Sequence, residues 1–135
     1  MLSINEPGSE TASFFQRIGG ETHIRELVDA FYDVMDEDPQ TDTVRRMHPD
    51  DLSGSRTKLY EFLVGWMGGP PLYMNKYGHP RLRMRHLPFE IDEAARDQWM
   101  HCMVIAMQRV GLDETLRRDL EKSLYAVADF MRNTQ

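Results

Sequence analysis

The stretch from Gly65 to Phe89, GWMGGPPLYMNKYGHPRLRMRHLPF, divides this 135-residue chain into two helical halves. Its start, Gly68-Gly69-Pro70-Pro71, breaks a helical pattern, and we expect a loop beyond it. Near its end, Pro88 lacks an N–H and keeps the preceding residue out of the helical region, so a short helix over 81–86 must stop at His86. We expect the segments before and after this stretch to form two walls of a pocket.

His86 lies among apolar and basic side chains. The apolar ones are Leu82, Met84, Leu87 and Phe89, and the basic ones are Arg81, Arg83 and Arg85. An imidazole at a helix end in such surroundings suits an iron ligand, and nearby arginines suit the anionic carboxylates of a cofactor. The same residue types also fit a surface histidine in a basic loop. Local sequence leaves both interpretations open.

Helical periodicity dominates the remainder of the chain. Apolar residues recur at helical spacing over 22–37, 54–67, 92–110 and 113–132, with Asp92 and Asp113 as expected N-caps of the last two helices. Shorter helical pieces are predicted over 13–18 and around Val44 and Met47, the second ending at His48-Pro49. No strand-like alternation occurs, so we predict an all-α domain over residues 13–135 behind a flexible arm at 1–12.

Composition narrows the function classes. The net charge is −6, which argues against a general nucleic-acid or anionic-membrane surface, although the arginines of 81–85 form a local basic patch. No apolar run approaches membrane-spanning length. The first residues do not resemble a secretory signal, and Cys102 is the single cysteine, which excludes an internal disulfide. A cytoplasmic location is the default expectation.

The chain resembles the group II truncated haemoglobins over roughly residues 14 to 130. The motifs that carry the likeness are Gly-Gly-Pro at 68–70, GHPRLRMRH at 78–86 with Pro88-Phe89 behind it, Phe31-Tyr32, Arg45-Arg46-x-His48-Pro49 and Trp99-x-x-Cys102-Met103. One departure is visible: an aromatic residue is expected directly before Gly-Gly-Pro, whereas this chain has Met67 there and Trp66 one position earlier.

The resemblance implies a truncated globin fold, a two-over-two helical sandwich that pairs 22–37 with 54–67 and 92–110 with 113–132. It also implies a b-type haem with His86 as the iron ligand. The expected haem contacts are Lys58, Phe62, Leu63, Tyr73, His79, Met84, Arg85, His86, Phe89, Trp99 and Met103. The expected distal residues, which would face a bound gas, are Tyr32, His48, Ser55, Leu59 and Trp99, with His48 favoured as a hydrogen-bond donor.

The residues themselves leave simpler roles open for several of these positions. Tyr32 lies on the border of an apolar stripe, where a tyrosine can aim its hydroxyl into a cavity or touch water. Lys58 could reach a haem carboxylate or remain solvated. The indole N–H of Trp99 needs a partner when it is buried. Asp97 and His101, one helical turn apart, are expected to form a surface pair.

Three functions compete at this point. The first is reversible binding of dioxygen and other diatomic ligands at a five-coordinate iron, as a monomer or homodimer. The second is a haem enzyme, a nitric oxide dioxygenase or a peroxidase-like activity, which requires a reductant that the sequence does not name. The third is a cofactor-free helical interaction module. Other chemistry is poorly supported, since no phosphate-binding glycine loop and no paired Glu-x-x-His motif is present.

Overall fold

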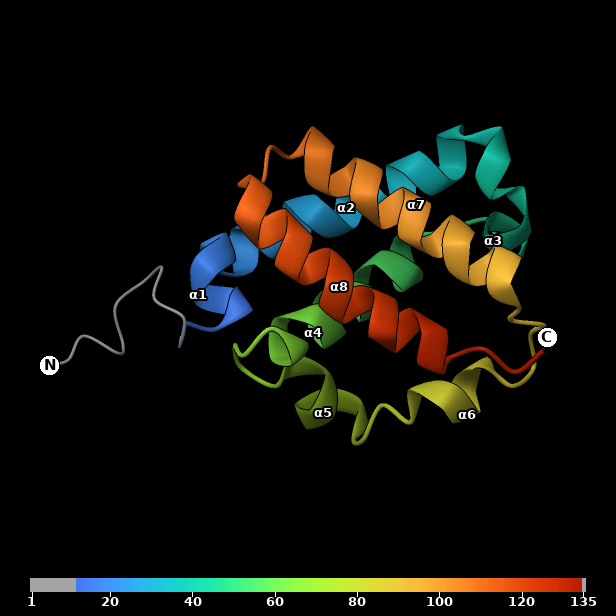
Figure 1. Cartoon of the computed structure of the whole chain (residues 1–135). Coiled ribbons are helices and arrows are strands. Elements are labelled where there is room, and N and C mark those ends of the chain that lie inside the picture. The colour runs from blue at the N-terminus through green and yellow to red at the C-terminus, as the bar shows by residue number, and fades with distance from the viewer. Residues whose placement is uncertain (1–11, 135) are drawn as a thin grey trace, which may run out of the picture.

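The computed structural model describes residues 12–134, and within that range the chain is helical with no strand (Figure 1). The elements are α1 Phe14–Ile18, α2 Glu21–Glu37, the 3-10 turn η1 Pro39–Thr41, α3 Asp42–Arg46, α4 Ser53–Trp66, α5 Leu72–Tyr77, α6 Leu82–His86, α7 Glu93–Arg109 and α8 Glu114–Phe130. The predicted all-α class is confirmed. Most of the predicted arm, residues 1–11, lies outside the described part of the chain.

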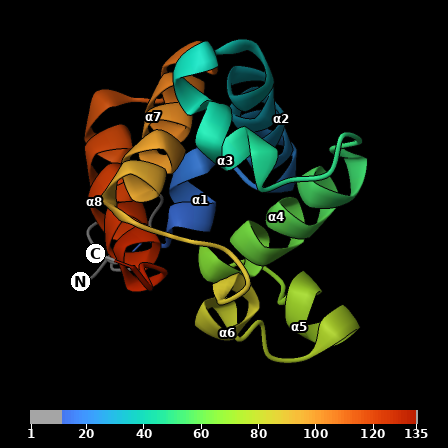
Figure 2. The same ribbon diagram turned by 90° about the vertical axis from the view of Figure 1, so that its right-hand side faces the viewer.

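Four long helices form two packed pairs. α2 packs on α4, α7 packs on α8, and α2 also crosses α7, which joins the pairs. Figure 2 shows α7 and α8 on one side of the molecule and α2 and α4 on the other. Phe31, Leu63 and Met103, one from each of three of these helices, are fully buried where they meet. The predicted pairing and the two-over-two arrangement are therefore confirmed.

The two predicted N-caps of the second pair form as expected. An Asp92 carboxylate oxygen accepts a hydrogen bond from the Ala95 N–H at 2.9 Å, and one from Asp113 accepts from the Leu116 N–H at 3.1 Å. Each cap satisfies a backbone donor that the first turn leaves free and stabilises its helix by about 1 kcal/mol. Because both helices begin where the sequence predicts, the caps also fix which side of α7 carries Trp99 and which side of α8 carries its apolar residues.

The Gly-Gly-Pro corner is shaped by the packing of α1 against it. The Phe15 N–H donates to the Met67 carbonyl at 2.8 Å, which brings the two segments into contact. Gly68 has φ +104°, and a Cβ on Gly69 would collide with the Phe15 ring. Both glycines are therefore required for α1 to close this end of the domain.

The segment after this corner contains a helix that the sequence analysis treats as loop. α5 begins directly after Pro70-Pro71, and the Pro71 carbonyl accepts its first helical hydrogen bond, from the Asn75 N–H at 3.0 Å. Proline is tolerated at the start of a helix because the first N–H groups have no intrahelical partner. The prolines that end α4 thus also permit α5, and the expectation of an uninterrupted loop was wrong.

α6 begins at a strained residue. Arg81 has φ +48°, the only positive value for a non-glycine residue among the described residues, a conformation that costs roughly 1 kcal/mol. Its N–H donates to Nδ1 of His79 at 3.0 Å, and the Arg85 Nε–H donates to the Pro80 carbonyl at 2.8 Å. These contacts fix the sharp turn that starts the helix carrying His86.

α7 holds the α3 segment in place through side chains. The Gln98 side-chain oxygen accepts from the Val44 N–H at 3.1 Å. The imidazole of His101 lies 2.8 Å from an Asp38 carboxylate oxygen, while Asp97 is paired with the neighbouring Arg96. The expected Asp97–His101 surface pair was wrong, because the end of α2 offers His101 a carboxylate from another element.

Candidate functional site

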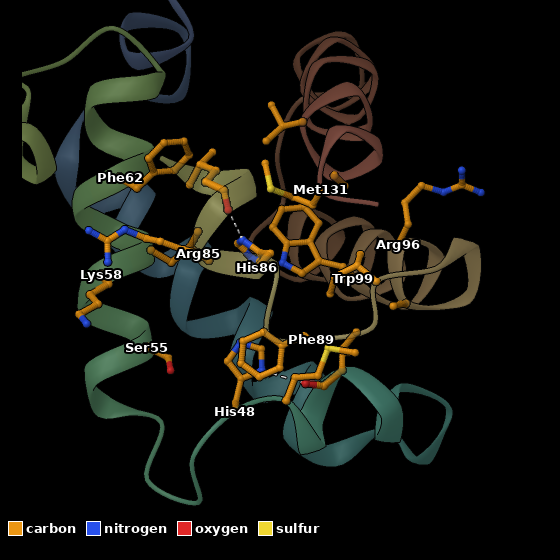
Figure 3. Close-up of a pocket in the computed structure, with 18 of the residues that line it drawn as sticks. His48, Ser55, Lys58, Phe62, Arg85, His86, Phe89, Arg96, Trp99 and Met131 are labelled. Carbon is orange, nitrogen blue, oxygen red and sulfur yellow. Dashed lines mark hydrogen bonds between the residues drawn. The ribbon is translucent and has the colours of Figure 1, made fainter. Parts of the chain in front are cut away.

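A cavity of about 320 Å³ lies between the two helix pairs, and α6 closes one side of it. This volume falls within the range of roughly 300–1,000 Å³ that is usual for small-molecule sites. The predicted residues that line it are Tyr32, His48, Ser55, Lys58, Leu59, Phe62, Leu63, Tyr73, Arg85, His86, Phe89 and Trp99. Figure 3 shows His86 and Trp99 near the centre of this group, with His48 from the α3 end and Ser55 and Lys58 from α4.

Three of the predicted haem contacts do not line the cavity. Met103 is fully buried in the core between the helix pairs. Met84 is 53% exposed on α6. His79 is exposed in the turn before α6, where Nδ1 accepts from the Arg81 N–H.

Other lining residues escaped the sequence analysis as site residues. They are Val44, Met47, Leu82, Ile91, Ala95, Arg96, Leu124, Val127, Ala128 and Met131. Leu124, Val127 and Met131 lie at the helical spacing that predicts the apolar face of 113–132, a pattern that does not distinguish a core position from a cavity wall. No pattern in the sequence marks Arg96 as a site residue. Its guanidinium points away from the cavity (Figure 3) and pairs with Asp97 and Asp129.

The tautomer of His86 follows from its hydrogen bond. Its Nδ1 lies 2.6 Å from the Leu82 carbonyl oxygen, which can only accept, so Nδ1 carries the proton (Figure 3). The lone pair is then on Nε2. A backbone carbonyl that fixes the ring and raises its basicity is the usual support for a metal-ligating imidazole. His86 is therefore held in the tautomer that a metal ligand requires.

His48 is held in the same way at the end of α3. Its Nδ1 donates to the Val44 carbonyl at 2.8 Å, and burial lowers the pKa of the imidazole below its usual value. Neutral His48 thus presents a lone pair on Nε2 to the cavity. In this state it can accept a hydrogen bond or coordinate a metal, but donation from Nε2, the role that the resemblance favours, requires a second proton.

Two aromatic donors face the cavity from α2 and α7. Tyr32 is buried, and Trp99 is half-buried; their rings pack against Phe31 with centroids 4.9 and 5.0 Å away. Within residues 12–134, neither the Tyr32 hydroxyl nor the Trp99 N–H has a hydrogen-bond partner. Burial raises the pKa of Tyr32 well above its usual value, so the hydroxyl stays protonated. Both groups are available as donors to a ligand in the cavity.

Donors of another kind flank the α4 and α6 walls. Lys58 and Arg85 line the cavity and are exposed to solvent. Tyr73 also lines it, with its ring edge-on to that of Phe62 and the centroids 6.4 Å apart. Figure 3 shows the Lys58 and Arg85 side chains on the same, α4 side of the cavity. Cations and a phenol at an open rim suit the carboxylates of an otherwise apolar ligand.

The chain matches the model of the bacterial-like globins over residues 13–133. Group 2 truncated hemoglobin YjbI of Bacillus subtilis is 40% identical over 84% of both chains. The group II 2-on-2 hemoglobin of Agrobacterium tumefaciens has a similar structure, with a TM-score of 0.87 and 40% identity over 95% of this chain and 99% of that one. The truncated oxygen-avid haemoglobin of Bacillus subtilis has a TM-score of 0.82 and 38% identity, over 90% and 100%.

The chain belongs to the bacterial-like globin family, among the group II truncated haemoglobins. Membership implies a haem cofactor, and the donor set of this globin fits one. The cavity offers two imidazoles, those of His86 and His48, each with Nδ1 bound to a backbone carbonyl and Nε2 free, together with apolar walls from α4, α7 and α8 and cationic groups at one rim. The departure at Met67 does not alter the wall, because Met67 is buried and Trp66 stacks on Phe14 outside the cavity.

Proposed function

We propose that this globin holds a b-type haem through His86 and reversibly binds dioxygen and other diatomic ligands. The observation that carries the proposal is the fixed tautomer of His86, whose only free nitrogen is Nε2, in a cavity that also contains the unpartnered donors of Tyr32 and Trp99. When bound, a haem with one axial histidine supplies an iron with an open sixth position. We place the protein in the cytoplasm and treat residues 13–135 as one domain.

The distal side chains would act on the ligand by hydrogen bonding. Bound dioxygen would carry partial negative charge, to which the Tyr32 hydroxyl and the Trp99 N–H would each donate a hydrogen bond. A hydrogen bond contributes about 1 kcal/mol net, and one to a charged acceptor roughly 1.5–3 kcal/mol. Two such bonds would slow ligand release by orders of magnitude. The oxygen-avid relative from Bacillus subtilis supports this direction.

At the rim, Lys58, Tyr73 and Arg85 would contact the haem carboxylates. The carboxylates would remain partly solvated there, because Lys58 and Arg85 are exposed. Ion pairs in such positions contribute about 0–1 kcal/mol each. We therefore expect most of the affinity for haem to come from the apolar walls and from His86, and the rim to set the orientation of the ring.

His48 would serve as an acceptor or as a competing ligand. Because the neutral imidazole carries a lone pair on Nε2, it could accept from the Tyr32 hydroxyl, whose ring lies edge-on with centroids 5.6 Å apart. Alternatively, it could occupy the sixth position of iron until a gas displaces it. The two roles differ in the spectrum of the ligand-free ferrous protein, five-coordinate in the first case and six-coordinate in the second.

A second candidate is oxidation of nitric oxide, with dioxygen as the co-substrate and an external reductant. The same two donors favour it, because they would retain dioxygen long enough for a second molecule to react with it. A cofactor-free interaction module has less support, since such a module has no use for two aromatic donors and two imidazoles that face a cavity.

Absorption spectroscopy of the purified, haem-loaded protein tests the primary proposal. We expect a strong Soret band, a shift of that band with dioxygen and carbon monoxide, and return to the starting spectrum when the gas is removed. Turnover of nitric oxide at a rate far above that of dioxygen release would favour the enzyme. Failure to take up haem would contradict both.

A further inference from the structure

The charges of this globin are unevenly distributed. Residues 62–89 contain four basic side chains, Lys76, Arg81, Arg83 and Arg85, and no acidic one. The whole chain has a net charge of −6, so the remaining residues carry −10. Within residues 12–134, Arg81 and Arg83 have no carboxylate within ion-pair distance, unlike most arginines of the protein. Their charge is therefore available to an acidic partner.

The same segment exposes apolar side chains. Among the described residues, seven large apolar side chains are exposed, and five of them are Met74, Tyr77, Met84, Leu87 and Phe89. Met74, Met84 and Leu87 are each more than half exposed. Clustered exposed apolar groups with basic neighbours are typical of a protein interface rather than of a solvated face.

These residues lie at one edge of the molecule. Both ribbon views place α5, α6 and the turn between them together, on the side opposite the crossing of α2 and α7 (Figures 1 and 2). We call the surface formed by residues 72–89 the basic face. It is the outer side of the elements that carry Tyr73, Arg85 and His86 into the cavity.

A series of aromatic ring contacts connects the basic face to the cavity. The Tyr77 ring, 39% exposed, lies 4.7 Å from the Tyr73 ring, which in turn lies 6.4 Å from Phe62, centroid to centroid. Tyr73 and Phe62 both line the cavity. Lys58 and Lys76 place their Nζ atoms 5.7 and 5.4 Å from the Tyr77 ring. A group docked on Tyr77 is thus separated from the cavity by packed rings.

We propose that the basic face is the docking surface for an acidic protein that delivers single electrons. The inference rests on the proposed haem site, for which it supplies the missing reductant. In the step, a donor cluster or flavin loses one electron and ferric haem iron becomes ferrous, with no bond formed or broken. Opposite charges would steer the encounter, and the exposed apolar side chains would be covered in the complex.

The charge distribution favours a protein over the other polyanions. Nucleic acid and anionic membranes are extended surfaces, and the −10 carried by the rest of the chain would repel them beyond the basic face. An acidic protein presents a limited patch that matches this face in size. Arg81 and Arg83 set the charge of the face without belonging to the cavity lining. Their substitution also removes the bond from the Arg83 guanidinium to the Arg132 carbonyl, so the Soret spectrum of the variant must match that of the wild type before binding is compared.

The test uses haem-loaded protein and a plant-type [2Fe–2S] ferredoxin, an acidic one-electron donor. The face variant is Arg81→Asp with Arg83→Glu; aspartate tolerates the positive φ of position 81. The control is Arg117→Glu with Lys122→Glu on α8, which changes the net charge equally away from the basic face. Kd is measured for oxidised ferredoxin by calorimetry at low salt, and reduction of ferric haem by reduced ferredoxin is followed by stopped flow.

We expect the face variant to raise Kd and to slow reduction by about tenfold or more, and the control to change either by less than about threefold. Both differences should shrink as salt increases. Equal losses in the two variants, or binding to phosphatidylserine vesicles, single-stranded RNA or a second copy of the chain in preference to ferredoxin, would overturn the proposal. Absence of a Soret band would instead contradict the proposed haem site. The two failures can be distinguished, because calorimetry measures the Kd for ferredoxin without using the haem absorption.

Discussion

Replacing Trp99 by Phe isolates the contribution of one distal donor. The indole N–H has no protein partner among the described residues, so its hydrogen bond is available to a ligand in the cavity. The Phe ring keeps most of the apolar volume and can retain the contact with Phe31, whose ring lies 5.0 Å from that of Trp99. The fold and the haem content should therefore be preserved.

The expected magnitude follows from the loss of that bond. One hydrogen bond to a partly charged oxygen contributes about 1.5 kcal/mol, and 1.4 kcal/mol corresponds to a factor of ten. Dioxygen dissociation should therefore be about tenfold faster in Trp99→Phe. Tyr32→Phe should have a similar effect, since it removes only a hydroxyl. If both donors share one ligand atom, the effects in the double mutant should not add.

Stopped-flow measurement of dioxygen release decides between a polar pocket and simple packing. Trp66→Phe and Tyr60→Phe are matched controls, because they remove the same groups from residues that do not line the cavity. Both controls should release dioxygen at the wild-type rate. Unchanged rates in Trp99→Phe and Tyr32→Phe would refute the reasoning and would mean that the pocket discriminates ligands by shape alone.

Three further outcomes are expected. Replacing Lys58 or Arg85 by Ala should speed haem transfer to a haem-free acceptor globin by no more than about fivefold, since exposed pairs contribute at most about 1 kcal/mol. The Gln40 N–H and His101 lower the pKa of Asp38 below 3.8. The contribution of its carboxylate to stability is therefore present above pH 3.8 and lost at lower pH. In Asp38→Asn, the free energy of unfolding measured with urea should fall less steeply as the pH is lowered below 3.8. Gly69→Ala should lower the melting temperature, because its Cβ meets the Phe15 ring.

Local signals predicted the long helices and the position of His86. Periodic apolar residues and the caps at Asp92 and Asp113 act within a few residues, so the sequence contains nearly all the information that places these helices. Pro88 acts locally in the same way, and α6 ends at His86 as predicted. What such signals did not predict was α5, where Pro70-Pro71 both ends one helix and permits the next.

The features that the sequence did not predict depend on distant segments. Met100 and Met107 are buried together with Ala95, Cys102, Met103 and Ala106, because α2 and α8 cover α7 on two sides. His101 binds Asp38, which is 63 residues away. The protonation state of His48 could not be predicted either, since it depends on the Val44 carbonyl and on burial in the folded chain.

The central claim is that Nε2 of His86 binds the haem iron, and the haem spectrum of His86→Ala tests it most directly. His23→Ala is the matched control, because it removes an imidazole on α2 that lies outside the cavity and bonds to the Ile18 carbonyl. We expect His86→Ala to lose most of its haem, or to require added imidazole to recover the wild-type Soret band, while His23→Ala keeps both. Normal haem content and an unchanged spectrum in His86→Ala would contradict the assignment.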